Sequence, residues 1–525
     1  MVLRTGDLRK GDLRKGSRNT FTMRPAVLRK GNLCKGHNAL VHLHRGPNIS
    51  QRALEATLKT IREHGLPEYS SRRSQFRARA ETVLRDTPYG PVMQVLHLGA
   101  ESPDIYISHP LALLYRTAKE CEPFQRVLQN TLRKHPCSVS NPWRLVIYFD
   151  EITPTDPCSG KVDRHKIQGF YWTFMELAEI KFDDKIWFVV SCSPSVGAAK
   201  LEAGMSQLVK HVLRKCFFDN EGFNLETSGI FLDESAGMGV PVRLFARHAY
   251  TICDFNALKE LLQAMGAKGL KPCPSCSNVV KDDLAVHGDL LVPLSSLDPD
   301  TWKRHTDKSV VQLQDYLRSQ KPLMSATAFS DLESRLGYHY RPSSILVDRE
   351  LNYKAMSTLR YDWVHCYFSN GIFGKELDAF VEKARQCSPR GRPPWISYRD
   401  FHAYMSSWTC PACWSSCKNI FERGHMAATA SEQMTVAPLI RLFFEDVVLR
   451  EPALGKLHAA ARSASLACAA VEMMQCATRS LVGHSQLLLA VREHLQQHLF
   501  VYGVLWWTLK YHLAQHIAED YGCDN

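Results

Sequence analysis

The segment Trp143-Arg-Leu-Val-Ile-Tyr-Phe-Asp150 constrains the fold most, because it is an apolar run that ends in an acid. A run of this kind is typical of a strand that is buried on both faces of a sheet. Further strand-like runs cover residues 169–174, 185–192, 229–232 and 242–253, and one helix is expected over residues 200–218. Strands that follow one another closely, with a helix among them, predict an α/β fold with a mixed sheet and Asp150 on its central strand.

Apolar residues at helical spacing dominate on both sides of this predicted core. Helices are expected within residues 51–136, at residues 256–265, and after residue 427, including residues 459–474 and 485–516. A chain of 525 residues exceeds the size of most single cores. The domains we predict are a basic disordered tail (1–50), a helical lead-in (51–140), the first part of the core (141–270), a large insertion with a Cys-x-x-Cys knuckle (271–425), and a helical C-terminal part of the core (426–525).

The positive charge of the chain is concentrated at its start. Residues 1–50 hold eleven Lys or Arg and two Asp, so +9 of the net charge of +12 lies there. This segment repeats units such as Leu-Arg-Lys-Gly-Asp, and their glycines oppose helix formation. We predict a disordered tail that is either a phosphate-binding arm or a low-complexity extension without a selected role. Any contact of the folded part with nucleic acid then requires a local basic patch.

Composition also narrows the class of protein. The longest apolar run, residues 499–509, is shorter than the roughly 18 residues that a membrane span requires, so no membrane association is expected. The basic N-terminal segment lacks the pattern of a secretion signal, which predicts an intracellular protein, nuclear if it acts on DNA. Seventeen cysteines at irregular spacings favour reduced thiols and metal ligation over a disulfide framework.

Two acids that end strand-like runs are candidate ligands for divalent metal ions. Asp150 ends the first strong strand and Asp254 follows the last one before the helical region, so both are expected at the same edge of the sheet. Two-metal phosphoryl transfer requires carboxylates from separate elements that hold two ions about 4 Å apart. An acid after a strand is also a common helix cap or turn residue, and the residues alone leave both interpretations open.

Three blocks of sequence extend this pattern. Tyr148-Phe-Asp150-Glu-Ile-Thr-Pro comes first. Cys253-Asp254-Phe-Asn-Ala-Leu follows and leads to Lys268-Gly-Leu-Lys-Pro-Cys273-Pro-Ser-Cys276. The third block is Asp362-Trp-Val-His365. In this order the blocks resemble the first-aspartate strand, the second-aspartate block and the Asp-x-x-His signature of CACTA-type transposases and their Kyakuja-Dileera-Zisupton relatives, over roughly residues 143–521.

This resemblance implies a ribonuclease-H-like core, a large insertion and a third catalytic acid at the start of a helix after that insertion. The best match is Glu432, which lies 178 positions after Asp254. A carboxylate at that position can instead simply favour the start of a helix. The rival acids for the third position are Glu422, Glu445 and Asp446.

Two cysteine pairs are candidate zinc ligands. Cys273 and Cys276 have the spacing of half a tetrahedral site, and Cys410 with Cys413 can complete it if folding brings the pairs together. Cys410, Cys413 and the nearby Cys417 can instead be buried reduced thiols. By resemblance, His365 is a metal ligand or a group that positions DNA, and its alternative is a core histidine.

The expected function is therefore that of a transposon-derived DNA transposase. The resemblance implies Mg²⁺ or Mn²⁺ held by Asp150, Asp254 and Glu432, DNA as partner and assembly as a homo-oligomer. The cysteine spacing adds Zn²⁺ as a candidate ion, and no small-molecule cofactor is expected. The alternative is a catalytically decayed remnant that acts only as a DNA- or protein-binding module. A nuclease on the same fold is a third class that the residues leave open.

Overall fold

The structure of the protein is a computed structural model, which describes residues 3–4, 87–98, 104–152, 166–180, 186–232, 241–281, 296–409, 420–421, 426–478 and 480–521. Of the predicted disordered tail, only Leu3–Arg4 is described; it forms the short strand β1, which pairs with β11 (Trp408–Thr409). The rest of that tail lies outside the described residues.

The described residues contain a five-stranded mixed sheet in the order β10-β9-β4-β5-β6. Its strands are β4 (Trp143–Ile152), β5 (Ile167–Phe174), β6 (Phe188–Pro194), β9 (Ala246–Cys253) and β10 (Leu359–Tyr361). β5 is antiparallel to both of its neighbours, whereas β4, β9 and β10 are parallel. The prediction of a mixed sheet with Asp150 on its central strand is confirmed.

The apolar run of β4 explains why this strand is central. Leu145, Ile147 and Phe149 are fully buried, and Val146, which points the opposite way, is also buried. The ring of Phe149 stacks on that of its neighbour Phe170, on β5, at a centroid distance of 6.0 Å. Such cross-strand aromatic pairs stabilise a sheet and fix its register.

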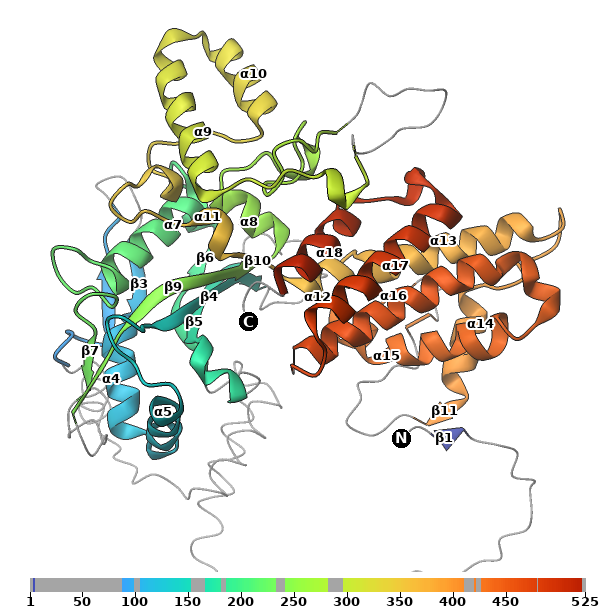
Figure 1. The fold of residues 1–525 in the computed structure, drawn as a ribbon, viewed down its shortest axis with the longest axis horizontal. Helices are drawn as coiled ribbons and strands as arrows, with labels where there is room; N and C mark the ends of the chain where they lie inside the picture. The colour runs from blue at the N-terminus through green and yellow to red at the C-terminus, as the bar shows by residue number, and fades with distance from the viewer. Residues whose placement is uncertain are drawn as a thin grey trace, which may run out of the picture. The chain divides into compact units, whose positions relative to one another are not determined.

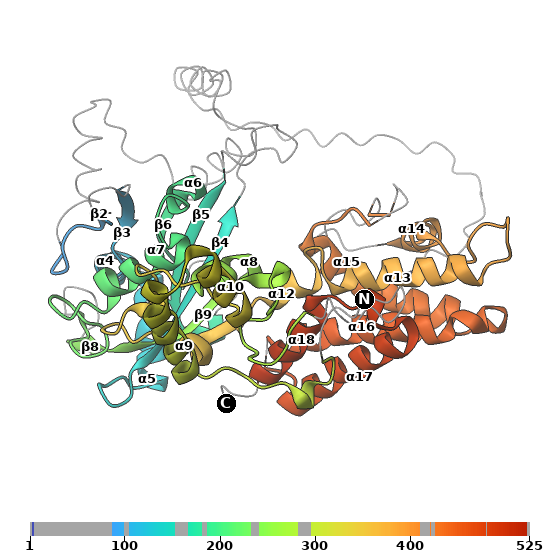
Figure 2. The same ribbon diagram turned by 90° about the horizontal axis from the view of Figure 1, so that it is seen from above.

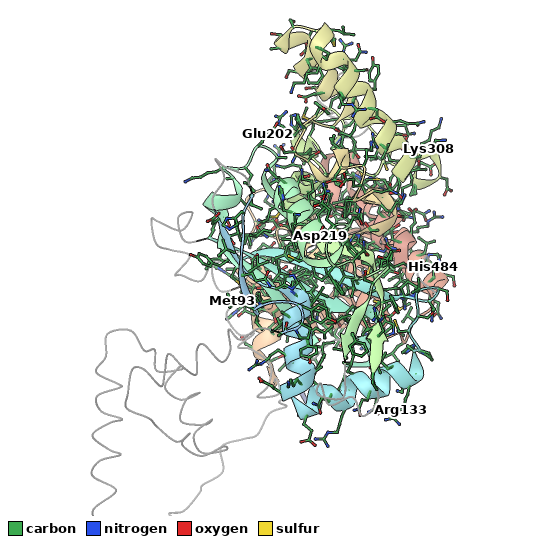
Figure 3. The ribbon with its side chains drawn as sticks, turned by 90° about the vertical axis from the view of Figure 1, so that its left-hand side faces the viewer. Met93, Arg133, Glu202, Asp219, Lys308 and His484 are labelled. Carbon is green, nitrogen blue, oxygen red and sulfur yellow. The ribbon has the colours of Figure 1, made fainter. Side chains whose placement is uncertain are left out.

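Short strands and helices surround the sheet. A hairpin of β2 (Met93–Leu96) and β3 (Ile105–Ser108), which the sequence did not predict, precedes α4 (Pro110–Glu120) and α5 (Glu122–Lys134). A second hairpin joins β7 (Ile230–Leu232) to β8 (Val242–Leu244). The helices between the strands of the sheet are α6 (Ser195–Ala198), α7 (Gly204–Val212) with a π-helical extension over Leu213–Phe217, α8 (Phe255–Leu261), α9 (Asp307–Gln320), α10 (Ala326–Leu336) and α11 (Ala355–Thr358). In Figures 1 and 3, the α9–α10 pair with Lys308 and helix α5 with Arg133 lie at opposite ends of this part of the molecule.

After β10 most of the described residues are helical. The helices are α12 (Trp363–Tyr367), α13 (Ile372–Cys387), α14 (Tyr398–Ser406), α15 (Ala430–Phe443) with a π-helical extension over Phe444–Val448, α16 (His458–Ala477), α17 (His484–Tyr502) and α18 (Leu509–Asp520). Figures 1 and 2 show α13, α16, α17 and α18 side by side, and we call these four helices the bundle. Helix α18 contacts α17 and also α12 and β10, so it joins the bundle to the sheet.

The long helix expected over residues 485–516 is interrupted in the structure. Helix α17 ends at Tyr502, and Gly503 has φ 67° and ψ −166°, a conformation that is essentially restricted to glycine. A short 3-10 helix, Val504–Trp506, follows before α18 begins. Within the described ranges, no helix combines the length and the apolar composition that crossing a membrane would require.

Candidate functional site

The register of the three parallel strands brings three aspartates to one edge of the sheet. Phe149 on β4 is paired with Cys253 on β9, and Cys253 is paired with Tyr361 on β10. Asp150, Asp254 and Asp362 are the next residues after these partners. The structure thus brings together the two predicted catalytic aspartates and the aspartate of the Asp-x-x-His block. We call these three residues, which follow the paired ends of the parallel strands, the aspartate edge.

Asp150 is half-buried on the central strand, directly after the last residue of β4 that pairs with β9. Its Oδ2 atom accepts a hydrogen bond of 3.0 Å from the hydroxyl of Tyr148, and its Oδ1 atom accepts one of 2.8 Å from the backbone N–H of Glu151. Burial raises the pKa of the Asp150 carboxyl, and the negative charge of Asp254 acts in the same direction. The edge therefore disfavours a further unpaired negative charge.

Asp254 and Asp362 both cap helices. Oδ1 of Asp254 accepts a hydrogen bond from the backbone N–H of Ala257 at the start of α8. Oδ1 of Asp362 accepts hydrogen bonds from Val364 and His365 at the start of α12. The helix-cap interpretation of a strand-ending acid is thus correct for both residues, and it coexists with their position at the shared edge.

His365 faces the same group of acids. Its Nδ1 atom lies 2.7 Å from Oδ2 of Asp362, and this hydrogen bond raises the pKa of the imidazole, with further contributions in the same direction from Asp150 and Asp254. The amine of Lys510, on α18, donates to the backbone carbonyls of His365 and Ser369. An imidazole whose pKa is raised therefore lies beside these carboxylates.

Glu432 and its rivals have other partners. The carboxylate of Glu432 accepts hydrogen bonds from the backbone N–H (2.8 Å) and the hydroxyl (2.9 Å) of Thr429, which form a capping box at the start of α15. Glu445 pairs with Arg441, and Asp446 pairs with Arg450. Glu422 lies outside the described residues. Glu432 therefore has a local partner at the start of α15, and its role as the third acid stays a prediction.

The zinc site predicted at Cys273 and Cys276 contains two further candidate ligands that were not predicted from the sequence. Cys273 and Cys276 lie beside His512 and His516 of α18, all four side chains are buried, and one possible ligand atom of each lies within 4.8 Å of the others. Sγ of Cys276 lies 3.2 Å from Nε2 of His516 and 3.5 Å from Nε2 of His512, and Sγ of Cys273 lies 3.6 Å from Nε2 of His516. With Zn–S bonds of about 2.3 Å and Zn–N bonds of about 2.0–2.1 Å, a tetrahedral ion separates sulfur and nitrogen by about 3.6 Å. We call these four residues the Cys₂His₂ cluster.

The pKa values of the two cysteines in the Cys₂His₂ cluster are shifted in opposite directions. Burial opposes ionisation of Cys273, but the hydrogen bond from Cys276 and the imidazoles of His512 and His516 outweigh it, so the pKa of Cys273 lies well below its usual range. The pKa of Cys276 is raised by that same hydrogen bond and by burial. These contacts favour ionisation of Cys273, and the thiolate is the form of cysteine that binds metals.

The surroundings hold the cluster in place. The hydroxyl of Tyr361, on β10, lies 2.6 Å from that of Ser275 in the knuckle. The ring of Trp302 packs on His512 at a centroid distance of 3.9 Å. Arg304 forms ion pairs with Glu519 and Asp520 at the end of α18. Groups around the ligands that restrict their orientation are typical of metal sites.

Cys410, Cys413 and Cys417 lie outside the described residues, so the sharing of one ion between the two cysteine pairs stays a prediction. The signal for the histidines is present in the sequence, because His512 and His516 are four positions apart and lie on one face of a helix. Nothing in the sequence links that helix to a knuckle more than 200 positions earlier.

A cleft among the described residues lies toward the other end of the strands. It has a volume of about 1170 Å³, and its lining includes Arg144 at the start of β4, His248 and Tyr250 of β9, and Lys354. The lining also contains several acids, so its charge is mixed. The aspartate edge is not part of this cleft.

In comparisons with known proteins, no protein-family model and no curated protein matched this sequence.

Proposed function

We propose that the chain is a divalent-metal-dependent phosphoryl transferase that acts on DNA, of the class to which transposases belong. The observation that carries this proposal is the register of β4, β9 and β10, which aligns Asp150, Asp254 and Asp362 at the carboxyl ends of three parallel strands. Acids from separate strands at one sheet edge are what a metal-assisted displacement at phosphorus requires.

The topology of the sheet supports the same class. The order β6-β5-β4-β9-β10, with only β5 reversed relative to its neighbours, is the order expected of a ribonuclease-H-like sheet. In that fold the first catalytic acid lies on the central strand, which here carries Asp150. The resemblance of the three sequence blocks to transposases points in the same direction. DNA as substrate, a homo-oligomeric assembly and a nuclear location belong to this proposal.

The donor set of the edge suits Mg²⁺ or Mn²⁺. Three carboxylates follow register partners on neighbouring parallel strands, and oxygen donors are the ligands that these ions prefer. A bound ion would supply Lewis acidity and a more nucleophilic water or DNA 3′-hydroxyl. The protein itself positions these groups. Tyr148 and Glu151 orient Asp150, and the caps of α8 and α12 fix Asp254 and Asp362. His365 is placed where it can pair with a phosphate.

The Cys₂His₂ cluster is proposed to hold Zn²⁺ in a structural role. Two thiolates and two imidazoles are the donor set of closed zinc sites. All four side chains are shielded from solvent, which leaves no open position for a substrate. The ion would fix α18 against the segment after α8 and against β10, and Lys510 at the start of the same helix contacts α12.

The experiment is a plasmid-nicking assay with the purified full chain in Mg²⁺, in Mn²⁺ and in EDTA. Nicking should require the metal and should fall at least 100-fold in Asp150→Asn, Asp254→Asn and Asp362→Asn, while Asp331→Asn, at an exposed position on α10, keeps it. Equal nicking by the wild type and all variants would overturn the proposal.

The caps give the decayed-remnant alternative a specific basis, because Asp254 and Asp362 would be retained for helix capping even without catalysis. Under this alternative the wild type binds a DNA duplex in a gel-shift assay but nicks it in neither metal. Calorimetry then shows no binding of Mn²⁺ that depends on Asp150.

A further inference from the structure

Three buried residues form a polar cluster inside the bundle. Glu376 lies on α13, and His494 and His498 lie on α17, with exposed fractions of 1% for the glutamate and 0% for both histidines. Nδ1 of His498 lies 2.7 Å from Oε2 of Glu376, and Nε2 of His494 lies 3.4 Å from the same oxygen. One possible ligand atom of each residue lies within 4.8 Å of the others. The spacing of four positions places both imidazoles on one face of α17.

Residues of the other two bundle helices complete the surroundings. The hydroxyl of Ser463, on α16, donates to Oε1 of Glu376 at 2.5 Å, and that of Tyr511, on α18, donates to Oε2 at 3.3 Å. All four bundle helices, which Figure 2 shows side by side, therefore meet at one carboxylate. Among the described residues, the ion pairs of Glu376 are with histidines and with no lysine or arginine.

This arrangement poses a problem of charge. A buried carboxylate without a counter-charge costs several kcal/mol, on the order of the whole stability of a small domain. A proton on one imidazole would supply the charge. Its second N–H would then be buried without an acceptor, because Nδ1 of His494 and Nε2 of His498 have no hydrogen-bond partner in the described part of the chain. An unsatisfied N–H costs more on a charged ring than on a neutral one.

A divalent cation supplies the counter-charge while both rings stay neutral, and each ring then keeps one N–H that has no acceptor among the described residues. One carboxylate and two imidazoles are a common donor set for zinc and other first-row metals. Bonds of about 2.0–2.1 Å in a tetrahedron separate adjacent donors by about 3.4 Å. Nε2 of His494 lies 3.4 Å from Oε2 of Glu376, and the distance from Nδ1 of His498 to the same oxygen must lengthen from 2.7 Å by roughly 0.7 Å on the same bond lengths.

We propose that Glu376, His494 and His498 bind one divalent transition-metal ion of the Zn²⁺ type. Because the three side chains are shielded from solvent, the ion meets no substrate and acts as a clamp between α13 and α17. This site shares no ligand with the Cys₂His₂ cluster or with the aspartate edge, so it stands independently of the proposed function.

The test is a Co²⁺ titration of the metal-free wild-type chain in excess Mg²⁺. Co²⁺ bound to thiolates gives a near-ultraviolet charge-transfer band, whereas Co²⁺ bound to nitrogen and oxygen alone gives only visible d–d bands. We expect the charge-transfer band to saturate at one ion per chain while the tetrahedral d–d bands continue to grow to two. Saturation of both bands at one ion per chain would overturn the proposal and leave the cluster as a hydrogen-bond network.

Variants assign the second ion. Glu376→Gln and His498→Gln should each remove one ion per chain, measured by elemental analysis, and keep the charge-transfer band. His458→Gln, at a partly exposed histidine on α16, should keep both ions. Cys276→Ser should remove the charge-transfer band and keep the d–d bands of the second site. Loss of no ion in Glu376→Gln and His498→Gln would contradict the assignment.

Discussion

Phe149 on β4 and Cys253 on β9 are register partners, and the aspartates that follow them in the chain lie at the same edge of the sheet. Burial and the charge of Asp254 both raise the pKa of Asp150. Folding therefore concentrates negative charge at this edge, and the edge is stabilised by any cation that it binds.

The melting temperature should rise when Mn²⁺ is added. At a concentration ten times the Kd, binding to the folded state adds about 1.4 kcal/mol to the free energy of unfolding. Asp150→Asn should lose this response and should itself be neutral or slightly stabilising, since it removes a repelled charge. Differential scanning fluorimetry checks this, with Asp331→Asn as the control that keeps the wild-type response. An unchanged response in Asp150→Asn would exclude Asp150 as a ligand.

Glu432→Ala should lower the free energy of unfolding by about 0.5–1 kcal/mol, because it removes half of the capping box of α15. Thr429→Ala should cost about as much, since it removes the other half. Urea unfolding measures both. Neither variant should change the response to Mn²⁺. A lost response in Glu432→Ala alone would return Glu432 to the metal site as the third acid.

Cys276→Ser should release the ion of the Cys₂His₂ cluster and lower the free energy of unfolding by at least roughly 3 kcal/mol, since metal binding contributes directly to folding. Cys216→Ser, at another buried cysteine, should keep the zinc content. Elemental analysis and urea unfolding provide the two measurements. A Cys276→Ser protein with the zinc content of the wild type would refute the assignment of this cluster.

The stability of the protein should fall as the pH drops from about 6.5 to about 4. Burial lowers the pKa of His109, which precedes α4, to about 4. The unfolded state takes up a proton near pH 6.5, whereas the folded state resists it, so stability is lost with falling pH over this range, by up to about 3 kcal/mol. His109→Gln should flatten this part of the profile, and His97→Gln, at an exposed histidine, should not. Parallel profiles for the wild type and His109→Gln would contradict this prediction.

Gly371→Ala should destabilise the protein by about 2–3 kcal/mol. A Cβ atom at this position, between α12 and α13, would lie 2.2 Å from the backbone carbon of Tyr367, which cannot move without displacing α12. Gly455→Ala is the matched control, because a Cβ atom there meets nothing within 4 Å. Thermal unfolding of the two variants compares a crowded glycine with an open one. Equal melting temperatures would show that the junction tolerates a side chain.

The sequence predicts secondary structure best where a segment is buried on both of its faces. β4 is predictable because it is apolar on both faces, and this pattern also places Asp150 at its end. β10 has only three residues, Leu359–Tyr361, which is too short for a periodic signal, and it lies within the part of the chain that we interpreted as an insertion. The hairpin of β2 and β3 was missed for the same reason.

The two clusters of histidines show a different limit. Spacing of four positions is visible for His494 with His498 and for His512 with His516, but it occurs on many helices that bind nothing. Their partners Glu376 and Cys276 are more than 100 positions away. Only the packing of α17 and α18 against earlier elements identifies them, and pairwise spacing contains no information about that packing.

The position of α18 in the chain has a consequence for biosynthesis. During translation the Cys273–Cys276 knuckle emerges from the ribosome more than 200 residues before His512 and His516. At typical synthesis rates of about 5–20 residues per second, the two thiols remain without these histidines for on the order of ten seconds or longer. Nascent chains of this protein should therefore be most sensitive to oxidants and to competing metals in that interval, and a pause before α18 is translated would lengthen it.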